Sequence, residues 1–145
     1  MTTNSKRHAF LIMALVTLMM VTALPALAGT KVIAHSGVAD ATLSQGDLQK
    51  IFLGKQGSWS NGAGIEVAVI SGGPAADEFL KTFVKKSPSQ FKTFWKKAVF
   101  SGTGTAPGEF ASDAEMVAWV AATPGAIGFV SDGAATDGCK TIAVQ

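Results

Sequence analysis

The chain has 145 residues, with 12 Lys and Arg, 10 Asp and Glu, two His and a single Cys. One cysteine excludes both an internal disulfide and a cysteine metal cluster. The near balance of charge gives no electrostatic basis for binding nucleic acid. The length allows one domain with one hydrophobic core.

Residues 1–28 have the pattern of a signal peptide. Lys6 and Arg7 precede an uncharged apolar run over residues 9–24, and Ala26-Leu27-Ala28 supplies the small residues of a cleavage site. We therefore expect cleavage after Ala28, export to the periplasm and a mature domain of residues 29–145. The alternative is an uncleaved membrane anchor, because the apolar run nearly reaches spanning length.

Cleavage would limit the chemistry of what remains. Without Lys6 and Arg7 the domain has 10 basic and 10 acidic residues, and no arginine to clamp a phosphate or carboxylate in a bidentate manner. Cys139 precedes the last predicted strand. A lone thiol in an oxidising compartment is either buried and inert or a route to a dimer, and we favour burial.

The first half of the domain predicts two strands and one helix. Residues 31–35 form a short strand. Ser44, with Asp47 three positions later, marks a helix start, and this helix ends at Gly54. A loop rich in glycine and serine covers residues 56–64. Residues 65–70 (IEVAVI) are the clearest strand, because β-branched residues dominate them.

The second half predicts three helices and two strands. Pro74 suits the first position of a helix, and a second helix opens at Ser87. Residues 100–110 read as a loop, and Ser112 with Glu115 predicts a full capping box for the third helix. The remaining strands cover residues 126–130 and 141–144. Strands that alternate with helices predict an α/β fold: a mixed, mostly parallel sheet with helices on its faces.

Neither catalysis nor metal binding is expected. His35 is the only histidine after residue 28, and Ser36 beside it would point to the opposite face of a strand. A single histidine with scattered carboxylates cannot build a metal site, and no cofactor motif is present. The sequence therefore predicts a protein that is not an enzyme and needs no cofactor or metal.

The segment from Ile70 to Pro74 has the best physical case for binding a ligand. A strand passes through Ser71, Gly72 and Gly73 into a helix start, where free backbone N–H groups favour an anion. Pro74 removes one of these donors, and acidic residues in the first helical turn oppose an anion. Ser36 is the expected second contributor, because parallel strands bring their carboxyl ends to one end of a sheet. Thr103 and Thr105, in a flexible loop, are expected rim contacts.

Four blocks of the sequence resemble the phosphate-type solute-binding proteins of bacterial ABC importers. They are residues 43–55 (LSQGDLQKIFLGK), 59–65 (WSNGAGI), 87–107 and 123–130 (TPGAIGFV), and they are most similar to the short, single-domain branch of that family. The resemblance implies a lobe of the periplasmic-binding-protein type (type II). It also implies that residues 71–74 occupy the place of the family's phosphate loop, which reads Gly-Ser-Gly-Thr after an arginine in full-length members.

Two functions remain open from the sequence. The first is a periplasmic binding protein for phosphate or a similar oxyanion, with an ABC permease or a membrane sensor as partner. The second is an interaction or sensor module that keeps the fold without tight ligand binding. The missing arginine and the length of about one lobe favour the second, whereas the family blocks favour the first.

Overall fold

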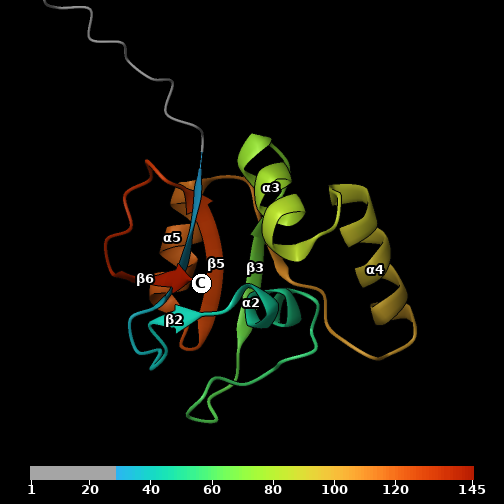
Figure 1. Ribbon diagram of the computed structural model, residues 1–145, viewed down its shortest axis with the longest axis horizontal. Coiled ribbons are helices and arrows are strands. Elements are labelled where there is room, and N and C mark those ends of the chain that lie inside the picture. The colour runs from blue at the N-terminus through green and yellow to red at the C-terminus, as the bar shows by residue number, and fades with distance from the viewer. Residues whose placement is uncertain (1–28) are drawn as a thin grey trace, which may run out of the picture.

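The computed structural model describes residues 29–145, so the expected signal peptide lies outside the described residues. A six-stranded sheet in the order β2-β6-β1-β5-β3-β4 forms the centre, with helices on both faces (Figure 1). The predicted mixed, mostly parallel α/β fold is confirmed. The strands are β1 (Thr30–His35), β2 (Thr42–Leu43), β3 (Glu66–Ile70), β4 (Gly108–Phe110), β5 (Ala126–Ser131) and β6 (Cys139–Val144).

Strand β1 runs against all the others. It pairs antiparallel with both β5 and β6, whereas the β2–β6, β3–β5 and β3–β4 pairs are parallel. Five strands therefore finish at one end of the sheet, which we call the carboxyl end. Because β1 is reversed, its first residue lies at that end: Thr30 pairs with Ser131, and Ala34 pairs with Ile127.

Four α-helices and one π-helical turn accompany the sheet within residues 29–145. They are α2 (Gln45–Phe52), α3 (Pro74–Phe79), the π-helical turn η1 (Leu80–Val84), α4 (Pro88–Phe100) and α5 (Asp113–Ala122). Serine side chains cap α2, α4 and α5. Ser44 accepts a hydrogen bond from the N–H of Asp47, as its spacing predicted. The full capping box lies at the start of α4, where Ser87 and Gln90 bond reciprocally, side chain to backbone.

The expected full capping box at Ser112 was wrong in one of its two bonds. The Ser112 hydroxyl accepts from the N–H of Glu115 at 3.2 Å, as predicted. The Glu115 carboxylate, however, accepts from the N–H of Ala111 at 2.9 Å rather than from the cap residue itself. The backbone of β4 runs directly into this cap, and it presents the preceding N–H to the carboxylate.

The helix predicted from Pro74 widens after Phe79. Residues 80–84 form a π turn, and Lys85 follows in the left-handed region at φ 61°. The carbonyl of Leu80 accepts from both the Lys85 and the Lys86 N–H, which closes the wide turn. Leu80 and Val84 are buried in this arrangement. The helix start at Pro74 was predicted, but the sequence could not distinguish a wide turn from an α-helical one.

The two faces of the sheet are covered by different helices. Phe79 of α3 stacks on Phe129 of β5, with ring centroids 4.0 Å apart, and meets Phe52 of α2 edge-on at 4.9 Å. Neighbouring residues of a strand face opposite sides. Gly128 accordingly lies against Met116 of α5, and a Cβ there would meet the methionine sulfur. Helices α2 and α3 thus share one face, and α5 covers the other.

Two short strands were missed. β4 lies within the predicted loop 100–110, and β2 has only two residues. Their side-chain patterns are too short to show an alternation, so only their pairing with β3 and β6 defines them. Among the described residues, no helix combines the length and apolar character needed to cross a bilayer.

Candidate functional site

The predicted anion loop lies at the carboxyl end of the sheet, between β3 and α3. Gly72 and Gly73 have φ values of 87° and 90°, which side-chain-bearing residues rarely adopt. A Cβ at either glycine would stand in open space, so backbone conformation rather than crowding requires them. Ser71 and Pro74 are exposed as well. The loop is therefore a solvent-facing turn shaped by two left-handed glycines.

Four backbone N–H groups of this loop and helix start have no acceptor within residues 29–145. They belong to Gly72, Gly73, Ala75 and Ala76, whereas the first intrahelical bond runs from the Asp77 N–H to the Gly73 carbonyl. Unpaired N–H groups at a helix start attract anions, and the helix dipole adds to the effect. These N–H groups are the hydrogen-bond donors that the site can offer to an anion.

Ser71 is already engaged. Its backbone N–H donates to the carbonyl of Phe110 at 2.9 Å, and its hydroxyl donates to the same oxygen at 3.3 Å. These bonds fasten the end of β3 to the end of β4. The hydroxyl would have to leave a long hydrogen bond to donate to a ligand, which costs little because the group is exposed.

The local electrostatics work against an anion. Asp77 and Glu78 belong to the first turns of α3, directly beside the free N–H groups. Asp113 and Asp132 also lie at the carboxyl end, because the Asp113 carboxylate accepts from the N–H of Ser131 at 3.3 Å and Asp132 directly follows β5. Arginine is absent after residue 7. The backbone N–H groups would therefore have to bind an anion against these carboxylates without help from a guanidinium group.

Ser36 does not join the site, and the expectation that it shares an end of the sheet with Ser71 was wrong. Ser36 follows β1, which is antiparallel to its neighbours, so it lies at the end where β3 begins. The five residues of β3 separate the two ends by about 17 Å at ~3.3 Å per residue. The prediction assumed a parallel first strand, and local sequence does not encode strand direction.

Thr103 and Thr105 also lie away from Ser71. The Thr103 hydroxyl donates to the Ala98 carbonyl at 3.2 Å and lies 3.0 Å from the Ser101 hydroxyl, so it closes the end of α4. Thr105 lines a separate hollow of about 510 Å³ beside Gly57 and Ile65, near the start of β3. The expected rim around the anion loop is therefore not formed by these two threonines.

Sequence reasoning missed two polar residues at the carboxyl end. Ser131 ends β5, the strand next to β3, and Thr30 pairs with it at the start of β1. Ser131 directly follows the predicted strand 126–130, so the rule that parallel strands end together could have found it. Thr30 could not be found this way, because its position depends on the reversal of β1.

His35 and Cys139 both form hydrogen bonds within the fold. The Nδ1 of His35 accepts from the N–H of Gly37 at 3.0 Å, within a turn. Cys139 is half-buried, its thiol donates to the Val117 carbonyl at 3.4 Å, and burial raises its pKa. Residues 29–145 contain no cluster of three or more His, Cys, Asp or Glu side chains placed to hold a metal ion.

Comparison with known proteins extends the fold assignment. No protein-family model matches the sequence, and no curated protein sequence matches it. Among solved structures, the chain is similar to PstS from Borrelia burgdorferi, with 16% identity and a TM-score of 0.62 over 80% of this chain. It is also similar to a Clostridium perfringens protein described as a putative phosphate ABC transporter substrate-binding protein with bound phosphate, with 18% identity and a TM-score of 0.64 over 81% of this chain. An ABC-type phosphate transport receptor from Vibrio cholerae has 17% identity and a TM-score of 0.55 over 81% of this chain.

The match covers only part of each solved structure. The chain spans 47%, 45% and 46% of the length of these three proteins, which is less than half. At identities below 20% the likeness concerns the backbone architecture rather than the ligand. The resemblance inferred from the sequence blocks is thus confirmed at the level of the fold: the described chain has the architecture of one part of phosphate-receptor structures from ABC transporters.

Proposed function

We propose that residues 29–145 form an exported, periplasmic and non-catalytic solute-binding domain. It takes phosphate or a similar oxyanion at the β3–α3 loop and serves an ABC importer. The observation that carries this proposal is the set of four unpaired N–H groups between Gly72 and Ala76, at a strand-to-helix turn. The same fold in solved phosphate receptors supports it.

Binding at this loop would use backbone donors first. An oxyanion over the start of α3 would accept from the Gly72 and Gly73 N–H groups, and Ser71 would turn its hydroxyl from Phe110 towards it. Because the glycines leave open space on this side, the anion can approach the backbone closely. Ser36, Thr103 and Thr105 take no part in the proposed site.

The affinity should be weak and sensitive to salt. The loop is open to water, Asp77 and Glu78 repel an anion, and no guanidinium is available. A tightly held dianion needs more donors and fuller desolvation than this loop offers alone. We therefore expect millimolar binding at this loop.

Backbone amide NMR of the protein titrated with phosphate tests the proposal. The amides of residues 71–73, 75 and 76 should shift at about 10 mM phosphate, a concentration that detects millimolar affinity. Ser71→Asp places a carboxylate in the site without disturbing the two glycines, and should abolish the shifts. Ser36→Asp, at the other end of the sheet, is the matched control and should leave them unchanged. Glu78→Gln removes a repelling charge and should strengthen binding.

A second function is favoured by the acidic surroundings of the loop. A domain that kept the fold and lost its ligand would show an open loop, carboxylates beside the helix start and no arginine, as here. It would act as an interaction module instead. If the amides of residues 71–73, 75 and 76 do not move at about 10 mM phosphate, and Glu78→Gln does not restore a response, this second function replaces the first.

A further inference from the structure

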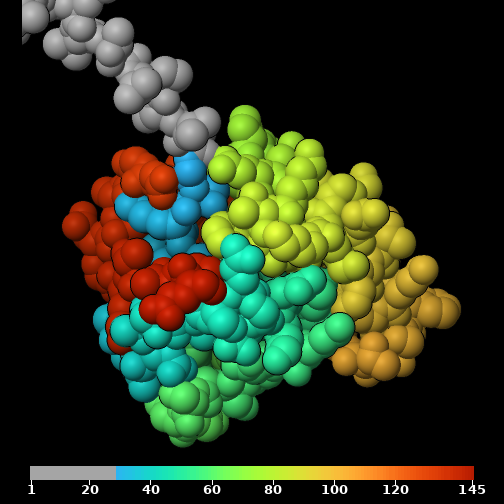
Figure 2. Space-filling view, viewed as in Figure 1, coloured from blue at the N-terminus to red at the C-terminus, as the bar shows by residue number. Residues whose placement is uncertain are grey.

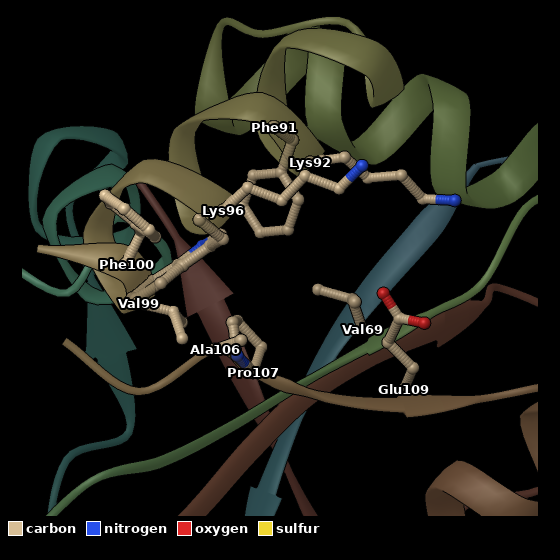
Figure 3. Close-up of a pocket in the computed structure, with 10 residues that line it drawn as sticks. Val69, Phe91, Lys92, Lys96, Val99, Phe100, Ala106, Pro107 and Glu109 are labelled. Carbon is tan, nitrogen blue, oxygen red and sulfur yellow. The ribbon is translucent and has the colours of Figure 1, made fainter. Parts of the chain in front are cut away.

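A groove lies between α4 and the β3–β4 edge of the sheet, and none of residues 71–76 lines it. Its volume is about 420 Å³, within the range typical of sites for small molecules. Its walls are mainly apolar and include an aromatic and aliphatic set drawn from β3, α4 and the loop before β4: Val69, Phe91, Trp95, Val99, Phe100, Ala106 and Pro107. Figure 3 shows these side chains around the hollow.

The apolar wall is unusually open at the end of α4. Phe100 is 95% exposed and Val99 is 51% exposed, and they are the large hydrophobic residues that the described fold leaves in solvent. Single exposed apolar residues are ordinary, but here two neighbours continue an apolar groove. The groove therefore offers contact area that no part of residues 29–145 covers.

The charge at the groove has one dominant sign. Lys92 and Lys96 line it from α4, and Glu109 lines it from β4. In Figure 3 the two lysine side chains extend from the helix over the apolar residues, opposite the Glu109 carboxylate. Residues 79–108 contain six lysines and no Asp or Glu. In Figure 2 the segment of residues 80–100, which carries these lysines, lies along one side of the molecule.

The groove is held in shape before any ligand arrives. The Trp95 Nε1–H donates to the Phe52 carbonyl at 3.2 Å in a buried bond, which fixes the indole against α2. Its ring meets Phe94 edge-on at 5.4 Å. Gly54 passes so close that a Cβ there would lie 2.7 Å from the ring. A preformed apolar wall lowers the entropic cost of binding.

We infer that this groove binds an amphiphilic organic monoanion: a small acid whose apolar body lies on Trp95 and Val69 and whose charge lies beside Lys92 and Lys96. Apolar burial supplies most of the affinity, and the two ammonium groups select an anion over a neutral molecule of equal size. Glu109 disfavours a dianion such as phosphate here. This site does not depend on the anion loop, because it uses none of residues 71–76.

Octanoate and 1-octanol have the same chain length and differ in charge, which makes them a suitable pair of probes for this site. Titration of the isotope-labelled protein, followed by amide and indole NMR, should shift the signals of the Trp95 Nε1–H and of the amides of residues 106, 108 and 109. Octanoate should bind roughly fivefold more tightly than 1-octanol, a difference expected for two exposed ammonium groups. Lys92→Gln with Lys96→Gln should remove that preference and leave 1-octanol binding unchanged.

Two controls distinguish binding in the groove from nonspecific binding. Lys85→Gln with Lys97→Gln removes the same charge from the other flank of α4, where both lysines line a different hollow. This pair should keep the preference for octanoate. Val99→Ser, at an exposed position, should weaken both probes equally. The inference would be overturned if both lysine pairs lost the preference for octanoate to the same extent. It would also be overturned by equal affinity for the two probes in the unmodified protein, or by shifts outside the groove.

A membrane surface is the competing occupant, because a basic helix with an exposed aromatic end can also adsorb to anionic lipid. Sedimentation with phosphatidylglycerol vesicles distinguishes the two. The inference holds if octanoate binds and competes with any vesicle binding. It is overturned if the protein sediments with the vesicles but shows no response to octanoate.

Discussion

The indole Nε1–H of Trp59 donates to the carbonyl oxygen of Gly125 at 3.0 Å, across 66 positions of sequence. The same oxygen accepts from the N–H of Glu66 at 3.1 Å. This shared acceptor ties the loop of residues 56–64 to the starts of β3 and β5. Two of the sequence blocks that carry the family resemblance, 59–65 and 123–130, thus meet at one atom, which gives them a structural role.

Trp59→Phe should lower the free energy of unfolding by about 1 kcal/mol through the lost hydrogen bond, and somewhat more through lost packing. Trp59 is only 3% exposed, so water cannot fully replace the donor. Urea denaturation measures the effect. Trp119→Phe is the control, because the Trp119 indole N–H has no acceptor within residues 29–145. Equal losses in both variants would show that the hydrogen bond contributes nothing.

Gly125→Ala should destabilise the protein more strongly, by about 2 kcal/mol or more. Gly125 has a φ of 78°, and a Cβ there would overlap the carbonyl oxygen of Gly64. Backbone atoms cannot move aside as a flexible side chain can. Gly133→Ala is the matched control, because a Cβ there meets nothing within 4 Å. Thermal melting of the two variants should separate clearly, and a melting temperature for Gly125→Ala close to the control would contradict the crowding.

Ser112→Ala should cost about 1 kcal/mol, the usual loss on removing an N-cap hydroxyl. The hydroxyl accepts from the Glu115 N–H at the start of α5, the helix that covers one face of the sheet. Ser89→Ala, in the exposed first turn of α4, lacks such a bond and should change stability by less than about 0.5 kcal/mol. No difference between the two serines would count against the cap.

The Asp40–Ser60 pair should make a small, pH-dependent contribution to the free energy of unfolding. The Ser60 hydroxyl and N–H both donate to the Asp40 carboxylate, which lowers the pKa of Asp40. The stabilisation is therefore complete above the unfolded pKa of about 3.9 and is lost as the pH falls through the lowered folded value. Ser60→Ala should reduce stability at pH 6 and much less at the acid end. A loss that grows on acidification would contradict this sign.

Cys139 should react slowly with alkylating reagents in the folded protein. Burial raises the pKa of its thiol, so less thiolate is present at pH 8 than in an exposed cysteine. Iodoacetamide labelling followed by mass spectrometry should be several-fold slower without urea than with it. The alternative of a Cys139-linked dimer predicts a reducible band of doubled mass on a denaturing gel.

Local physics determined much of this fold from the sequence alone. Caps at Ser44 and Ser112 marked two helix starts, and the β-branched run before Ser71 marked β3, because such preferences act within a few residues. The two glycines after Ser71 also predicted the turn from this strand into the next helix. For the same reason, the position of the loop between β3 and α3 and the free N–H groups after it could be predicted.

Only the tertiary structure decided which residues meet. Ser36 was assigned to the wrong end of the sheet because β1 runs antiparallel, and strand direction depends on partners almost 100 residues away, such as Ile127 and Gly128. β4 escaped notice because three residues show no period, and the apolar groove beside it needs α4 and β3 in place. Hydrophobic spacing tells which side chains are buried, but not the element against which each one packs, since burial is non-directional and strand pairing is not.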